Sequence, residues 1–62
     1  MIMSEELLNN LNNEPMERWC KYGVIIRSCR NGADGIINSF IIERCGKLHH
    51  GYRSYGKLTS GE

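Results

Sequence analysis

The segment from residue 22 to residue 42, YGVIIRSCRNGADGIINSFII, decides what this chain can fold into. Its β-branched residues lie in two runs on either side of a glycine-containing turn, and two periodicities compete there. Trp19, Tyr22, Ile26 and Cys29 recur at the 3-4-3 spacing of an amphipathic helix. Because this helical stripe is cleaner than any strand-like alternation, we expect two helices joined by the turn.

The alternative is an α+β fold with a hairpin at residues 22–42. β-branched residues favour strands, and Asn31-Gly32 is a favoured pair for a type I′ turn. The apolar residues of 36–42, however, fall on both faces of a strand rather than alternating. We therefore place the hairpin second to the helices.

The fold class expected from the sequence is all-α. Ser4 is a good N-cap for a short helix over residues 4–11, and Pro15 suits the start of a second helix over 15–30. A third helix over 34–46 would complete an antiparallel two-helix hairpin. Glycines recur five residues apart from Gly46 onward, but we find no repeat between them. Residues 1–48 are thus the expected domain, and 49–62 a flexible, irregular basic and aromatic tail.

Length limits how this fold is stabilised. A chain of 62 residues with 40% hydrophobic content buries a small core and needs reinforcement. Its three cysteines are an odd number without the spacing of a disulfide scaffold, which favours reduced thiols and a cytoplasmic location. We expect no membrane association, since no run of about 20 apolar residues occurs.

A metal site is a weak alternative among the chemical hypotheses. Cys45 and His49 are four residues apart and would share one face of a helix, as two zinc ligands do. There is no Cys-x-x-Cys pair to accompany them, and packing alone explains a buried Cys45. We expect buried thiols, exposed histidines, no metal and no other cofactor.

An apolar surface is the feature that most favours a function. Two antiparallel helices cannot cover all the apolar side chains of 19–42 from within one chain, and a leftover apolar surface marks an interaction site. The sequence also lacks a phosphate-binding loop and paired catalytic carboxylates, so we do not expect an enzyme. The first hypothesis is a small regulator that binds another protein stoichiometrically, completed by homodimerisation. Its expected interface residues are Trp19, Val24, Ile36, Phe40 and Ile42.

Charge supports a second hypothesis, a nucleic-acid-binding accessory or transcription-regulatory factor. Residues 1–19 sum to −3 and residues 20–58 to +5, so the basic charge lies in the second helix and the tail. Cations there are interspersed with tyrosines, which suits phosphate contact and base stacking. The residues expected to do this are Arg27, Arg30, Lys47, Tyr52, Arg53, Tyr55 and Lys57. No motif in the chain identifies a family.

Overall fold

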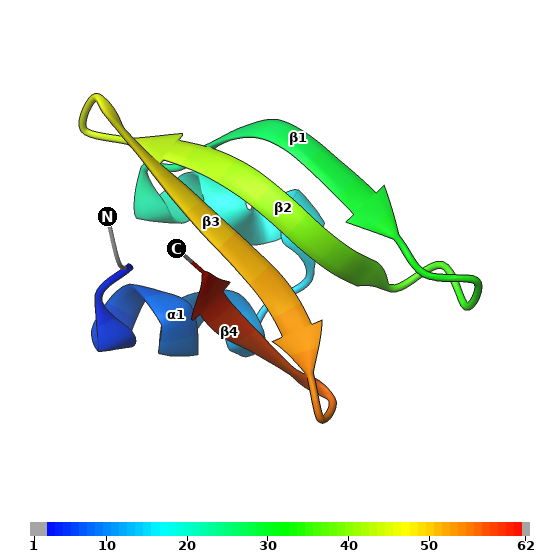
Figure 1. The fold of residues 1–62 in the computed structure, drawn as a ribbon. Helices are drawn as coiled ribbons and strands as arrows, with labels where there is room; N and C mark the ends of the chain where they lie inside the picture. The colour runs from blue at the N-terminus through cyan, green and yellow to red at the C-terminus, as the bar shows by residue number, and fades with distance from the viewer. Residues whose placement is uncertain (1–2, 62) are drawn as a thin grey trace.

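The computed structural model describes residues 3–61 and shows an antiparallel sheet with a short helical layer on one face (Figure 1). The four strands lie in chain order, β1-β2-β3-β4, so each pairs with the next. The all-α expectation, with its helical domain, is therefore wrong. The elements are α1 (Glu5–Asn12), the 3-10 helix η1 (Met16–Tyr22), β1 (Ile25–Asn31), β2 (Ile37–Arg44), β3 (Lys47–Ser54) and β4 (Lys57–Gly61).

The expected second helix ends far earlier than its apolar stripe suggested. η1 stops at Gly23, which takes the left-handed conformation with φ 78°. Three β-branched residues follow, and their restricted side chains favour an extended backbone. Trp19 and Tyr22 thus lie on a helical turn, whereas Ile26 and Cys29 lie on β1, and their shared spacing is coincidental.

The hairpin alternative matches the observed pairing of β1 with β2. A bulge explains part of the apolar pattern that argued against it. Arg30 pairs with Ser39 and Asn31 with Ile37, so Asn38 is an extra residue on β2. Ile37 and Phe40 are three residues apart, yet both are buried among the core residues.

Residues 49–62 were expected to be irregular, but 49–61 belong to the sheet as most of β3 and all of β4. Two-residue turns precede these strands, at Cys45-Gly46 and Tyr55-Gly56, and all four residues have positive φ. In both turns the glycine begins the triplet Gly-Lys-Leu, at 46–48 and 56–58. This ten-residue period was not predicted from the sequence, and it marks the two hairpin turns.

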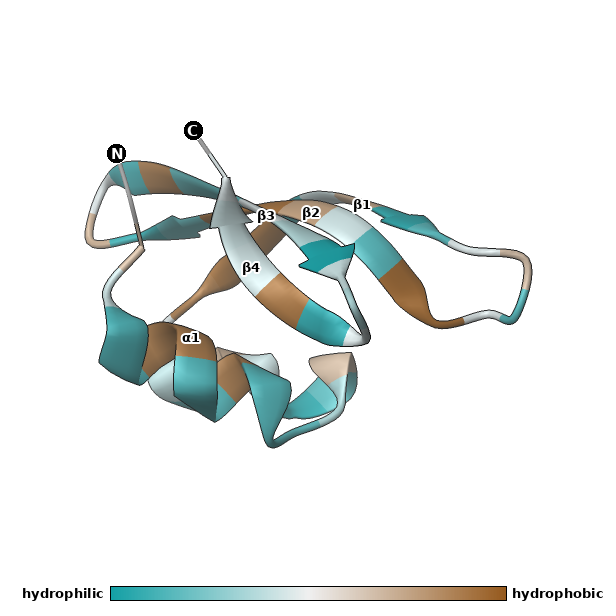
Figure 2. Cartoon of the chain, turned by 60° about the horizontal axis from the view of Figure 1, so that its bottom comes forward, coloured by the Kyte–Doolittle hydropathy of each residue, from teal (hydrophilic) through white to brown (hydrophobic). Residues whose placement is uncertain are grey.

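The core lies between the sheet and the helical layer, and the apolar side of α1 is turned toward the strands (Figure 2). Trp19 meets Phe40 edge-on, with ring centroids 5.1 Å apart. The Phe40 ring in turn lies on Gly51, where an added Cβ would come within 2.2 Å of Phe40 Cζ. Glycine is therefore required on the central strand β3 at this point.

The two edges of the sheet differ. At β4, the Asn12 carboxamide mimics a neighbouring strand: its Nδ2 donates to the Leu58 carbonyl at 3.1 Å, and its Oδ1 accepts from the Leu58 amide at 2.8 Å. The Ser60 hydroxyl also accepts from the Met3 amide. At the other edge, nothing within residues 3–61 pairs with the outer side of β1. The helical layer thus closes one edge and leaves the other open.

Replacing Asn12 with alanine should lower the free energy of unfolding by about 1 to 3 kcal/mol, because two polar groups of Leu58 lose their partner. Urea denaturation measures this change. Asn9→Ala is the matched control, since Asn9 is exposed on the same helix, and it should change stability by less than about 0.5 kcal/mol. Equal effects of the two substitutions would contradict the edge-capping role.

Candidate interaction surface

The sheet has one face without a covering layer, which we call the open face. Residues paired across antiparallel strands share a face, so three rows define it. The first row is Ile25, Glu43 and Leu48, the second is Ser28, Ile41 and His50, and the third is Arg30, Ser39, Tyr52 and Thr59. All four strands, from β1 through β4, contribute to this surface.

Large apolar side chains are the main feature of the open face. A sheet that is covered on one side normally carries polar residues on the other. Here Ile25 is 58% exposed, Leu48 52% and Tyr52 46%, and Ile41 is half-buried beside them. Ile41 and Leu48 are diagonal neighbours, because Ile41 pairs with His50 two residues further along β3. The open face therefore holds an aliphatic patch at one end.

Polar groups surround this patch. The Arg27 guanidinium lies 3.4 Å from the Glu43 carboxylate, with both side chains partly exposed. Beyond Ile41, a shallow depression of about 370 Å³ is lined by Arg30, Ser39 and His50 among others. The Tyr52 ring lies close over Gly61, where an added Cβ would be 3.3 Å from Tyr52 Cδ1. The open face combines an aliphatic end with a cationic and aromatic end.

Of the apolar residues expected at an interface, most belong to the core instead. Trp19, Val24, Phe40 and Ile42 are buried, and only Ile36 is exposed, at 51%. The expectation of a helical surface failed because Phe40 and Ile42 lie on β2, where they are buried in the core between the sheet and the helical layer, and Trp19 of η1 packs against Phe40 from the other side. Ile25 and Leu48 of the open face were not among the predicted site residues, although Leu48, His50 and Tyr52 alternate along one strand after a glycine turn.

The basic and aromatic residues expected to bind nucleic acid are only partly brought together. Arg30 and Tyr52 share the third row of the open face, whereas Arg27 is paired with Glu43. Arg53 is bonded to backbone carbonyls and pairs with the buried Leu58, on the covered side. The others lie at the hairpin turns or beside them: Lys47, Tyr55 and Lys57.

The cysteines and histidines are arranged differently from the expectation. All three cysteines are exposed free thiols, and Cys45 lies in the turn before β3. His49 is buried, and its Nδ1 makes no hydrogen bond within the described chain. Among residues 3–61, no three His, Cys, Asp or Glu side chains come together as metal ligands. Strand alternation explains this, because it turns His49 toward the core and His50 toward solvent.

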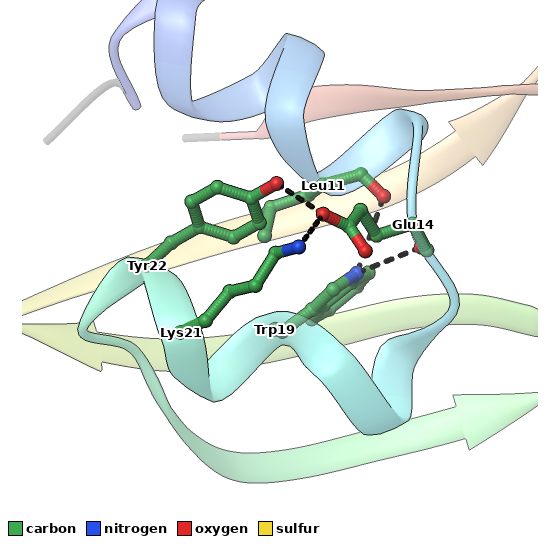
Figure 3. Close-up of polar contacts among 5 residues, drawn as sticks. All are labelled: Leu11, Glu14, Trp19, Lys21 and Tyr22. Atoms are coloured by element: carbon green, nitrogen blue, oxygen red, sulfur yellow. Dashed lines mark hydrogen bonds and ion pairs between the residues drawn. The ribbon is translucent and has the colours of Figure 1, made fainter.

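A polar cluster joins α1 to η1 on the covered side (Figure 3). The Trp19 indole N–H donates to the carbonyls of Leu11 and Glu14, at 3.2 and 3.1 Å. The Glu14 carboxylate accepts from the Tyr22 hydroxyl and pairs with the Lys21 ammonium. These groups satisfy one another, so the cluster ties the helical layer together.

The same contacts fix the charges of the cluster. Hydrogen bonds from Lys21 and then Tyr22 hold the pKa of Glu14 below its ordinary value. The Glu14 carboxylate in turn raises the pKa of Lys21 and of Tyr22, chiefly through those hydrogen bonds. A carboxylate with a lowered pKa is a weak general base at neutral pH. The cluster is suited to stabilising the helical layer rather than to proton transfer.

Comparison with protein-family models, with curated proteins and with solved structures finds no match to this chain. No helix of residues 3–61 is long and apolar enough to cross a membrane. The geometry of the open face and its surroundings is therefore the main evidence on function.

Glu14→Gln should destabilise the protein at neutral pH and much less in acid. Because the pKa of Glu14 is lowered in the folded state, its contribution is complete above the ordinary value of 4.5 and is lost as the pH falls through the folded pKa. Urea denaturation of both proteins between about pH 7 and pH 3 measures this difference. Glu17→Gln, an exposed position on η1, is the control. A difference between wild type and Glu14→Gln that does not change with pH would contradict the assignment.

Proposed function

We propose that this protein is a non-enzymatic regulator that acts by stoichiometric binding of another protein through the open face. The observation that carries the proposal is the exposure of Ile25, Leu48 and Tyr52 on a sheet face where polar residues are expected. Exposed apolar groups of this size, gathered on one surface, are typical of interaction sites.

The composition of the open face supports a protein partner. Fully burying an aliphatic side chain contributes about 1.5 to 3 kcal/mol, so Ile25, Ile41 and Leu48 would supply a substantial part of a binding free energy. Tyrosine and arginine are enriched in such interfaces, and Tyr52 and Arg30 lie in the row beyond the aliphatic patch. The patch would form the dry centre of the contact and the charged residues its rim.

The partner is either a second copy of the chain or a different protein, and either one would bind through the open face. A regulator of this kind has no need of a catalytic group. The Glu14 cluster agrees with that role, since its three side chains bind one another.

Leu48→Ser and Ile25→Ser should abolish binding without unfolding the chain, because both side chains project from the open face. Sedimentation equilibrium of the purified protein measures self-association, and affinity capture followed by quantitative mass spectrometry measures a different partner. Ile36→Ser is the matched control, since Ile36 is exposed to the same extent but lies outside the open face. A partner retained equally by all three variants, or a monomer that captures nothing, would overturn the proposal.

A second candidate, single-stranded nucleic acid binding, is favoured by one observation. Arg30 and Tyr52 flank Ser39 in a single row, with His50 in the next, so a cation and aromatic rings share one surface. Bases stack on such rings while cations contact phosphates.

Oligonucleotide binding separates the two candidates. If nucleic acid is the ligand, a single-stranded oligonucleotide should bind at low salt, weaken steeply as salt rises, and be lost in Tyr52→Leu and Arg30→Gln. Fluorescence anisotropy measures this. Under the protein-binding proposal, no binding of the oligonucleotide is expected even at low salt.

A further inference from the structure

A second hollow lies away from the open face, at the end of the molecule where the α1–η1 connection meets the loops of two hairpins. We call it the end groove. It has a volume of about 610 Å³ and is lined by Asn13, Met16, Asn31, Ile36, Ile37 and Arg53 among others. Its volume lies within the range of small-molecule sites in proteins.

Arg53 is the most informative residue of the end groove. It is half-buried, and its Nε donates to the Ile37 carbonyl at 2.8 Å while its Nη1 donates to the Gly56 carbonyl at 3.0 Å. A guanidinium has five N–H groups, so one on Nη1 and two on Nη2 remain. Within the described chain no carboxylate lies at ion-pair distance from it. The structure therefore holds a cation in place without a counter-ion.

The surroundings of Arg53 favour an anion. The asparagine-rich segment before Pro15 contributes Asn9 and Asn13 to the groove wall, and β1 contributes Asn31. Carboxamide N–H groups donate hydrogen bonds to carboxylate oxygens. Glu14 also lines the groove, but Lys21 and Tyr22 hold its carboxylate. The groove lining holds one further acidic residue, Glu17, and one further basic residue, Lys57.

Apolar side chains supply the other part of the groove. Ile36 is 51% exposed, although it stands beside the buried Ile37, and Met16 is partly buried against the core. An arginine fork next to apolar contacts is suited to a ligand with a charged head and an apolar body.

We propose that the end groove binds a small organic carboxylate, with its carboxylate on Arg53 and its apolar body on Met16 and Ile36. This proposal does not depend on the open face, and the two sites lie on different parts of the molecule. The end-on pair of N–H groups on Nη1 and Nη2 would hold both carboxylate oxygens.

Decanoate is the probe for this site, with 1-decanol as its uncharged counterpart. Displacement of the fluorescent anion 8-anilinonaphthalene-1-sulfonate measures binding of each. Decanoate should displace the dye at concentrations where decanol does not. Ile36→Ser should weaken decanoate binding about tenfold, which corresponds to losing one buried aliphatic side chain. Leu48→Ser, equally exposed but on the open face, should leave decanoate binding unchanged.

Arg53→Lys keeps the charge but loses the fork, and should weaken decanoate binding about tenfold or more. Because Arg53 also bonds two backbone carbonyls, this variant could unfold, so ¹H–¹⁵N spectra of the wild type provide a second measurement. Decanoate should shift the Arg53 Nε–H signal and the amides of Ile36, Ile37 and Gly56. Equal displacement by decanol, loss of binding in Leu48→Ser, shifts confined to the open face, or no binding at millimolar decanoate would each overturn the proposal.

Discussion

The Trp19 indole is the interaction on which the rest of the structure depends. Its N–H closes the connection between α1 and η1 through two backbone carbonyls, and its ring packs edge-on against Phe40 of β2. Phe40 in turn covers Gly51 on β3. One side chain, 1% exposed, thus joins both helical segments to the two central strands. An eight-residue helix and a short 3-10 helix are not stable alone, so this contact is what makes them a layer.

The small size of that layer explains the two candidate sites. It covers the central strands and β4 but does not reach β1, whose seven residues are all exposed. The face opposite the helices has no cover within residues 3–61, which leaves Ile25 and Leu48 in solvent. The end groove arises where the same layer stops short of the hairpin loops. Within residues 3–61 the chain completes one core and leaves these two surfaces uncovered.

Local signals in the sequence were informative where they depended on backbone chemistry. The first helix was predicted at 4–11 and observed at Glu5–Asn12, with the Ser4 hydroxyl accepting from the Leu7 amide as an N-cap should. Periodicity failed elsewhere because it assumes regular elements. The 3-10 helix changes to a strand at Gly23, and the bulge at Asn38 breaks the alternation of β2.

The candidate site, like the fold, depends on features that the local sequence does not show. Whether a leucine lies in the core or in solvent depends on strand pairing, as the repeated Gly-Lys-Leu triplet illustrates. Leu48 pairs with Glu43 on the open face, whereas Leu58 pairs with Arg53 on the covered face and is buried. The same triplet is therefore exposed once and buried once, because side chains alternate along the eight residues of β3 and its two ends present opposite faces. Arg53 was predicted from the sequence for its charge, but its position depends on the carbonyl of Ile37, on another strand, and on that of Gly56 in the adjoining turn.

The Asn12 carboxamide limits how copies of this protein can associate. A sheet with two free edges can add neighbours at both, and such head-to-tail addition has no natural end, which is how fibres grow. Here the β4 edge is occupied at Leu58 by a side chain of the same molecule. Strand addition is left to β1, and pairing of β1 with its own copy consumes the open edges of both molecules. Edge-to-edge growth of this sheet would therefore terminate at two chains.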